Sequence, residues 1–163
     1  MTIAIGDTLP DANVLTMSKD GPVQVSIADK VKGRTVVIFG LPGAYTGTCT
    51  TAHVPSFIRT LPQLKDKGVA EVICLSVNDP FVLSAWGAAT GASDAGITML
   101  GDVACEFTKA IGMEFSNPSR GFIDRSKRYA MLVEDGVVRI LNEETELGQC
   151  DISGGESLLD AMD

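Results

Sequence analysis

Short apolar runs rich in β-branched residues predict buried strands in this chain. Thr35–Gly40 reads TVVIFG, residues 69–77 read VAEVICLSV, and residues 97–100 form a shorter run. Runs of this length without regular polar alternation are typical of strands covered on both faces, as in a parallel or mixed sheet between helices. We therefore expect these three segments to form the centre of a sheet.

Helical spacing follows the first two of these runs. From about residue 48, apolar residues recur every three or four positions, which predicts a helix. Pro55 and Pro62 lie inside it, and because each proline removes a helix hydrogen bond we expect a kink or a break at both. The sequence Asn78-Asp79-Pro80 predicts the start of a second helix that runs toward Gly91.

The last third of the chain predicts two more helices and a hairpin between them. Residues 105–111 predict a short helix, and residues 129–141 predict a β-hairpin around the turn Asp135-Gly136. Ser153 and Glu156 have the spacing of a capping box, which predicts that the Ser153 side chain caps the last helix.

The order of these elements predicts the fold class. The first 32 residues, with turn signals such as Asp20-Gly21-Pro22, predict short strands and loops. Strand–helix units followed by an antiparallel hairpin and a final helix predict an α/β fold of thioredoxin-like topology, with a central mixed sheet flanked by helices and an N-terminal β extension. A length of 163 residues suits one core, so we expect a single domain over residues 1–163.

Charge narrows the class of partner. The chain has 13 basic and 21 acidic residues and a formal charge of −8, which argues against non-specific binding of nucleic acid or anionic membranes. A small molecule or a protein is the expected partner. No segment has the length of a membrane span, and the amino terminus lacks the basic and apolar regions of a signal peptide. We expect a cytoplasmic protein.

Histidine and cysteine limit the chemistry further. His53 is the single histidine, and the cysteines are Cys49, Cys74, Cys105 and Cys150. No two cysteines form a C-x-x-C pair, so neither a structural zinc site nor a dithiol redox motif is expected. A histidine-rich metal site is excluded, and four scattered cysteines in an acidic chain indicate intracellular thiols.

Cys49 stands where a strand leads into a helix. Sites in α/β sheets lie at such junctions, and Cys49 falls in the first turn of the predicted helix. Unpaired N–H groups and the positive end of the helix dipole favour an anion there, which makes Cys49 a candidate nucleophile. The Thr46 hydroxyl can cap the helix or bind the thiolate. The position alone leaves an ordinary buried cysteine as an equal alternative.

The residues around Cys49 resemble a known active site. Pro42-x3-Thr46-x2-Cys49 matches the signature of the peroxiredoxins, the thiol peroxidases. The wider stretches resemble the type II subgroup, the Prx5-like or atypical two-Cys enzymes, in the same order and spacing and over essentially the whole chain. These stretches are residues 39–55, residues 74–82 with Trp86, and residues 125–133.

The resemblance implies a role for each matched residue. Cys49 matches the peroxidatic cysteine, Thr46 the threonine that contacts thiolate and peroxide, and Pro42 the proline that shields the sulfur. Arg128 matches the active-site arginine, which fits physically because a guanidinium stays charged and offers several directed donors. The subgroup usually has proline after the threonine, whereas this chain has Gly47, which is expected to loosen the loop.

The resemblance also implies a function and partners. It implies reduction of hydrogen peroxide and alkyl hydroperoxides through a Cys49 sulfenic acid, in antioxidant defence and redox homeostasis, without metal, haem or flavin cofactors. Thioredoxin, glutaredoxin or glutathione would be the reductant, and a homodimer is expected because type II enzymes pair through surfaces near the active site. A redox-sensing thiol switch on the same fold is the alternative.

The remaining thiols and His53 leave alternatives open. Cys150 is the possible resolving cysteine, which would attack the Cys49 sulfenic acid after local unfolding; without it the enzyme is a one-Cys peroxidase. Cys74 is predicted to be a core residue, although a resolving role has been considered for related proteins, and Cys105 to be helix filler. His53 is expected to have a structural or dimer-contact role, and a Cys49–His53 hydrolase is a rival.

Overall fold

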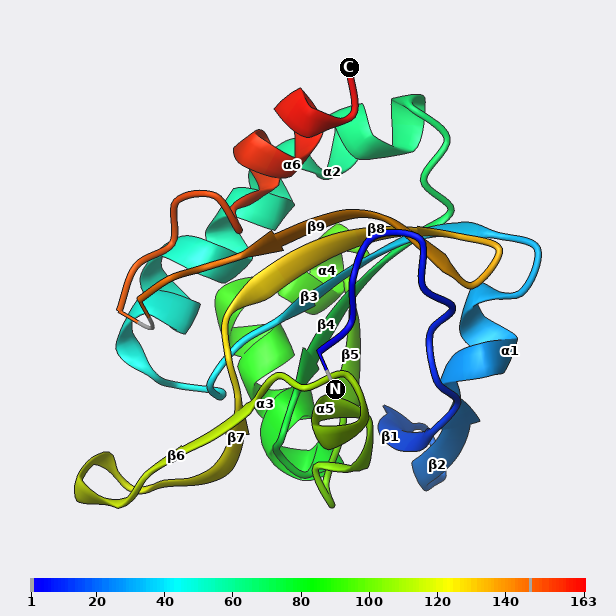
Figure 1. The fold of residues 1–163 in the computed structure, drawn as a ribbon. Helices are drawn as coiled ribbons and strands as arrows, with labels where there is room; N and C mark the ends of the chain where they lie inside the picture. Colours follow the sequence, from blue (N-terminus) through cyan, green and yellow to red (C-terminus); the bar gives the residue numbers. More distant parts are fainter. Residues whose placement is uncertain (1, 147) are drawn as a thin grey trace.

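The computed structural model describes residues 2–146 and 148–163, and the chain folds around one mixed sheet (Figure 1). The strand order of this seven-stranded sheet is β2-β1-β5-β4-β3-β8-β9. Strands β3, β4 and β5 are parallel, β8 pairs antiparallel with β3, and β9 pairs antiparallel with β8. The strands of the sheet are β1 (Asn13–Ser18), β2 (Gly21–Ser26), β3 (Thr35–Gly40), β4 (Glu71–Ser76), β5 (Thr98–Gly101), β8 (Tyr129–Glu134) and β9 (Val137–Glu143).

Helices cover both faces of the sheet. They are α1 (Ile27–Val31), α2 (Val54–Asp66), α3 (Pro80–Thr90), α4 (Ala92–Ala95), α5 (Glu106–Ala110) and α6 (Gly155–Ala161). Alternate residues of β3 divide between the two cores: Val37 and Phe39 pack with α2, α3 and α6, while Val36 and Ile38 pack with α1 and α5. The unbroken apolar run of β3 is therefore required, because both of its faces are buried.

The expected fold class is confirmed. The β1–β2 hairpin is the N-terminal β extension, joined to the edge of β5 by an antiparallel pairing at Leu15 and Gly101. In the described part of the chain, no helix has both the length and the apolar character that crossing a bilayer requires.

The short helices α1 and α4 and the strands β6 (Glu114–Asn117) and β7 (Phe122–Ser126) were absent from the prediction. α1 follows β2 directly, with the Ser26 hydroxyl accepting a hydrogen bond from the Asp29 N–H. The strands β6 and β7, joined by the 3₁₀ turn Pro118–Arg120, form a separate two-stranded arm that extends away from the body (Figure 1). Its strands are short and largely exposed, so they lack the apolar pattern that identifies a buried strand.

The helix after β3 differs from its prediction in two ways. A kink or a break was expected at Pro62; α2 runs unbroken through it, so the break is wrong. Before α2, residues 49–53 form a π-helical turn in which the Val54 N–H bonds to the Cys49 carbonyl. Pro55 has no N–H to offer the Thr51 carbonyl, which accounts for irregular hydrogen bonding at this point.

The predicted capping box is also wrong. Gly154, which has no side chain, is the N-cap of α6, and the Ser56 hydroxyl of α2 accepts a hydrogen bond from the Gly155 N–H at 2.9 Å. The Ser153 hydroxyl donates instead to Glu144 Oε2 at 2.6 Å, because a buried carboxylate competes for it.

Candidate active site

The site lies at the carboxyl end of β3, in the middle of the sheet. Gly40, the last residue of β3, sits opposite Tyr129 of β8, and a Cβ on Gly40 would stand 2.3 Å from the tyrosine ring. Only glycine therefore allows the two strands to pair at this point. The chain then crosses a loop and enters a helix at residue 47.

Cys49 occupies the first turn of that helix, as expected, and its side chain is fully buried. The π-helical turn places one extra residue between Cys49 and the following turns. Cys49, His53 and Phe57 follow one another at intervals of four residues, so they share one buried face of the helix. The thiol thus points into the molecule, toward the sheet.

Arg128 meets the thiol from the opposite side. It immediately precedes β8, and its side chain is buried although it carries a charge. Arg128 Nη2 donates to Cys49 Sγ at 3.2 Å, and Nη1 contacts His53 Nδ1 at 3.0 Å. Cys49 and Arg128, which are 79 positions apart in the sequence, are therefore in direct contact.

His53 is held in one neutral form. A guanidinium can only donate, so His53 Nδ1 accepts from Arg128 and the ring proton lies on Nε2. Nε2 then donates to the Ser153 carbonyl at 3.0 Å. Burial, together with the Arg128 charge, lowers the pKa of His53 from 6.5 to about 3. Both ring nitrogens are thus engaged by groups other than Cys49, so the geometry does not form the Cys–His pair of a hydrolase.

Glu144 anchors the segment that holds His53. Its Oε2 accepts hydrogen bonds from the N–H groups of Asp151 and Ser153, both at 2.8 Å, and from the Ser153 hydroxyl. Burial alone would raise the pKa of Glu144, but these hydrogen bonds outweigh it and hold the pKa below its usual value. An ionised Glu144 therefore fixes Ser153, whose carbonyl fixes His53.

Sequence reasoning missed Glu144 and Ser153. Together they complete a continuous series of contacts from Glu144 through Ser153, His53 and Arg128 to Cys49. The only sequence signal was the Ser-x-x-Glu spacing, which pointed to Glu156 instead.

Pro42 and Thr46 shape the loop before the helix. The Thr46 hydroxyl donates to the Gly43 carbonyl at 2.7 Å, so its proton is directed to the loop backbone and its oxygen can accept a further hydrogen bond. The Pro42 carbonyl accepts from Arg125 Nη1 at 2.9 Å. The loop is therefore fastened to its own backbone and to β7.

A cavity of about 440 Å³ opens beside these residues, and Cys49 lies below its surface. Three of the predicted site residues line it: Pro42, Thr46 and Arg128. The other lining residues come from the helix start, the β6–β7 arm and the C-terminal loop: Gly47, Thr48, Asn117, Arg120, Phe122 and Gly148. Three of the four predicted residues thus meet at one cavity, and one of them, Arg128, also contacts the Cys49 thiol.

Cys150, in the loop before α6, lies next to a different face of the helix start from the one that carries Cys49. It lines a separate cavity with Thr51, Ala52 and Ser56, whereas Cys49 belongs to the buried face. Burial raises the pKa of the half-buried Cys150 thiol. A bond between the two sulfurs therefore requires the helix start or the C-terminal loop to rearrange.

Comparisons with known proteins agree with this geometry. The redoxin family profile matches residues 4–159. Peroxiredoxin-2C of Oryza sativa subsp. japonica is 42% identical over 161 residues, with 98% of each chain covered. The structure of reduced Prx3 from Vibrio vulnificus in complex with H₂O₂ is 41% identical, with a TM-score of 0.93 over 99% of this chain and 100% of the other.

A more distant structure gives the same result. Peroxiredoxin 5 from Alvinella pompejana is 31% identical, with a TM-score of 0.85 over 98% of this chain and 97% of the other. Family profile, relatives and structures all cover nearly the full chain. The chain therefore belongs to the peroxiredoxins, the redoxin-domain thiol peroxidases that reduce hydroperoxides with a thiol reductant.

Proposed function

We propose that Cys49 is the peroxidatic residue of this enzyme and that its substrates are hydrogen peroxide and alkyl hydroperoxides. The observation that carries the proposal is the contact of 3.2 Å between Arg128 Nη2 and Cys49 Sγ. A fixed positive charge at this distance stabilises a thiolate, which is the reactive form of cysteine.

The remaining site residues have roles in the same step. The thiolate attacks the terminal oxygen of the hydroperoxide, the O–O bond breaks, and its electron pair leaves with the second oxygen, which takes up a proton as water or alcohol. Arg128 stabilises the negative charge that develops on the leaving oxygen. Thr46 accepts the hydrogen bond of the peroxide O–H, and Pro42 shields the sulfur. Cys49 becomes a sulfenic acid.

Recycling of the sulfenic acid proceeds by one of two thiol routes. In the first, Cys150 attacks Cys49, a disulfide forms with loss of water, and thioredoxin reduces the disulfide. In the second, glutathione or glutaredoxin resolves the sulfenic acid directly. The first route is supported by the place of Cys150 in a loop whose neighbouring residue Gly148 accepts a hydrogen bond from the Thr48 hydroxyl, one residue before Cys49.

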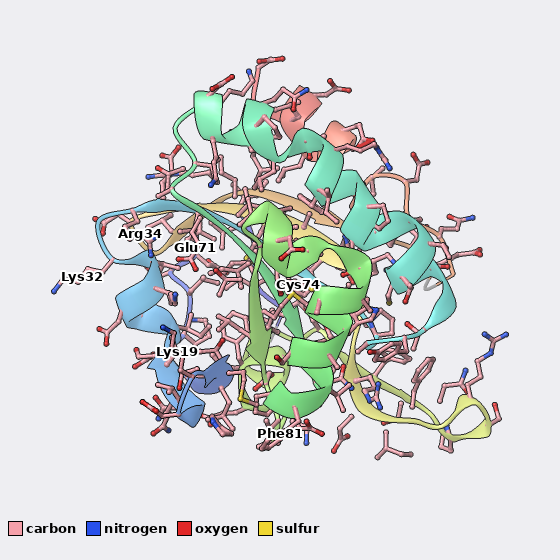
Figure 2. All side chains as sticks on the ribbon, turned by 180° about the vertical axis from the view of Figure 1, so that it is seen from behind. Lys19, Lys32, Arg34, Glu71, Cys74 and Phe81 are labelled. Atoms are coloured by element: carbon pink, nitrogen blue, oxygen red, sulfur yellow. The ribbon has the colours of Figure 1, made fainter. Side chains whose placement is uncertain are left out.

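We also propose that the enzyme is a homodimer that pairs near the active site. Two large aromatic side chains are exposed on this side of the molecule, Tyr45 at 58% and Phe81 at 65%. Tyr45 lies in the active-site loop, and Phe81 projects outward from the start of α3 (Figure 2). Analytical ultracentrifugation of the wild type and of Phe81→Ser tests this pairing.

Turnover assays test the proposed function and separate the two recycling routes. Peroxide consumption is followed with a thioredoxin system and with a glutaredoxin–glutathione system, for the wild type and for Cys150→Ser. Turnover with thioredoxin that disappears in Cys150→Ser supports the disulfide route. Turnover with glutathione that survives in Cys150→Ser supports the one-Cys route. If neither system sustains turnover while Cys49 oxidises slowly, the protein is a redox-sensing switch and the peroxidase proposal fails.

A further inference from the structure

The cavity beside Cys49 is positively charged in a protein that is acidic overall. Arg120 and Arg128 both line it, and none of the described lining residues is Asp or Glu. The chain as a whole has 21 acidic and 13 basic residues. The positive charge is therefore a local feature of this opening, and it is more than an uncharged peroxide requires.

The β6–β7 arm holds Arg120 at the rim. Gly121, at φ +78°, turns the chain back directly after Arg120, a conformation that favours glycine. Behind the turn, the Phe122 ring meets the Phe115 ring edge-on at 5.8 Å between centroids, and the Arg125 guanidinium lies 5.6 Å from the Phe122 centroid. Because Arg125 also donates to the Pro42 carbonyl, the arm is fastened to the active-site loop.

The Arg120 side chain is exposed and available to a ligand. Among the ion pairs formed by residues 2–146 and 148–163, none includes Arg120. The neighbouring arm residues supply what else a small organic molecule needs, namely the Phe122 ring as an apolar wall and Asn117 as a polar group. Arg120 is thus a charge without an internal counterion at the opening of a partly apolar cavity.

Gly47 is a lining residue of this cavity that has no side chain. A Cβ built on it would meet no atom within 4 Å. The glycine is therefore not required by close packing, and any side chain at this position would reduce the space beside Thr46. The opening accommodates a substrate larger than hydrogen peroxide.

We propose that this cavity binds organic hydroperoxides that carry a carboxylate, and that Arg120 pairs with the carboxylate while the hydroperoxide group reaches Arg128 and Cys49. The inference rests on the proposed function, because it needs Cys49 as the reacting thiol. The carboxylate takes no part in the reaction: Cys49 takes the terminal oxygen, the O–O bond breaks, and the substrate leaves as a hydroxy acid. Arg120 is consequently a specificity-determining residue and acts on substrate affinity.

Single-turnover oxidation of fully reduced protein provides the test. The probes are ω-hydroperoxy carboxylic acids of four to ten carbons, their methyl esters, and hydrogen peroxide. We expect the wild type to react about three- to tenfold faster with an acid of suitable length than with its ester, which is the range of an exposed or partly exposed charge-assisted pair. Raising the salt concentration should reduce this ratio.

Substitutions at Arg120 then assign the effect. Arg120→Gln should bring the acid-to-ester ratio to about one, Arg120→Lys should keep most of it, and hydrogen peroxide should react at the wild-type rate with both. Arg139→Gln is the matched control, since Arg139 is an exposed arginine of β9 that pairs with Glu134. Gly47→Ala should slow the organic probes more than hydrogen peroxide.

Three outcomes would overturn the inference: equal rates for acid and ester in the wild type, a ratio unchanged by Arg120→Gln, or an equal loss in Arg139→Gln. A second experiment tests whether Arg120 binds a carboxylate of the thiol reductant and not a carboxylate of the peroxide. Reduction of the Cys49 sulfenic acid by glutathione is compared with reduction by uncharged 2-mercaptoethanol, and an Arg120 effect confined to glutathione also overturns the inference. A wild-type protein that does not react with hydrogen peroxide would instead contradict the proposed function.

Discussion

Cys49, at the start of a helix, and Cys74, in the middle of β4, are both completely buried, but their thiols have different surroundings. Both residues belong to the same apolar core beneath α2 and α3. Cys49 receives a hydrogen bond from a guanidinium, whereas Cys74 lies in the interior of a strand (Figure 2). Burial raises the pKa of Cys74 well above its usual value, and the charge of Arg128 offsets only a smaller part.

The difference lies in what each buried sulfur contacts. An apolar surrounding penalises a thiolate, whereas a charged donor within hydrogen-bond distance favours it. Arg128 lies within 3.2 Å of one sulfur, and its own position is fixed through His53 and Ser153 by Glu144. The two thiols therefore differ in the orientation of one charge within a common core.

Exchange of the two sulfurs for hydroxyls gives the largest expected contrast. Cys49→Ser should abolish peroxide reduction, because serine is not ionised at neutral pH and cannot form a sulfenic acid. Cys74→Ser should keep the rate of the first oxidation within about twofold, since this step does not use Cys74. Stopped-flow kinetics with hydrogen peroxide measures both, and an inactive but folded Cys74→Ser would contradict the contrast.

Removal of the guanidinium should make Cys49 resemble Cys74. A hydrogen bond to a charged group contributes about 1.5–3 kcal/mol, so Arg128→Gln should slow the reaction of Cys49 with peroxide by roughly 10- to 150-fold. Arg139→Gln, an exposed arginine of β9, serves as the control and should have no effect. A rate within twofold of the wild type in Arg128→Gln would show that the helix start suffices without the arginine.

The neutral His53 gives the site a stability that depends on pH between about 3 and 6.5. Its pKa is lowered from 6.5 to about 3 in the folded protein, so the unfolded state takes up a proton between these values and the folded state does not. Stability is then fully present above pH 6.5 and falls by about 1.4 kcal/mol for each pH unit below it.

Denaturant unfolding between pH 6.5 and 5 measures this slope, since most carboxylates stay ionised there. His53→Gln should remove the contribution of one proton, because glutamine offers a similar donor and acceptor without titrating. Cys74→Ser is the control and should retain the wild-type slope. An equal slope in His53→Gln would show that His53 is not the group responsible.

The smallest expected effect concerns the far end of the series of contacts. Glu144→Gln removes the charge that holds Ser153 and should slow the reaction of Cys49 by about three- to tenfold, as expected for weakening of a charge-assisted hydrogen bond by about 1 kcal/mol. Glu143→Gln, at the neighbouring position and paired with Lys127, is the matched control. Equal rates in the two variants and the wild type would show that Arg128 needs no support from the C-terminal loop.

Much of the fold could be predicted because its signals are local. The apolar run of β3 coincides with the strand, and Asp79 caps α3, which Gly91 ends in a left-handed conformation, as the sequence indicates. Pro42, Thr46 and Cys49 lie within eight residues of each other, so their common loop was also predictable. Arg128 was assigned from the family resemblance, since no local pattern links it to Cys49.

The rest depends on contacts between distant segments. Ser153 had two partners to choose from, and the sequence spacing favoured Glu156, whereas the fold brings Glu144 to its hydroxyl. The π-helical turn follows from hydrogen bonds around Pro55 that no periodicity encodes. The position of Arg120 over the cavity depends on an exposed arm with little apolar pattern.

One measurement tests the central claim that Cys49, the thiol in contact with Arg128, is the one of the four that reacts with peroxide. Fully reduced protein receives one equivalent of hydrogen peroxide, the reaction is quenched within seconds, and mass spectrometry maps all four cysteines. The account predicts that Cys49 is consumed first, as a sulfenic acid or as a disulfide with Cys150, while Cys74 and Cys105 stay reduced. A Cys49 that remains reduced, or four thiols that oxidise slowly at the same rate, would contradict it.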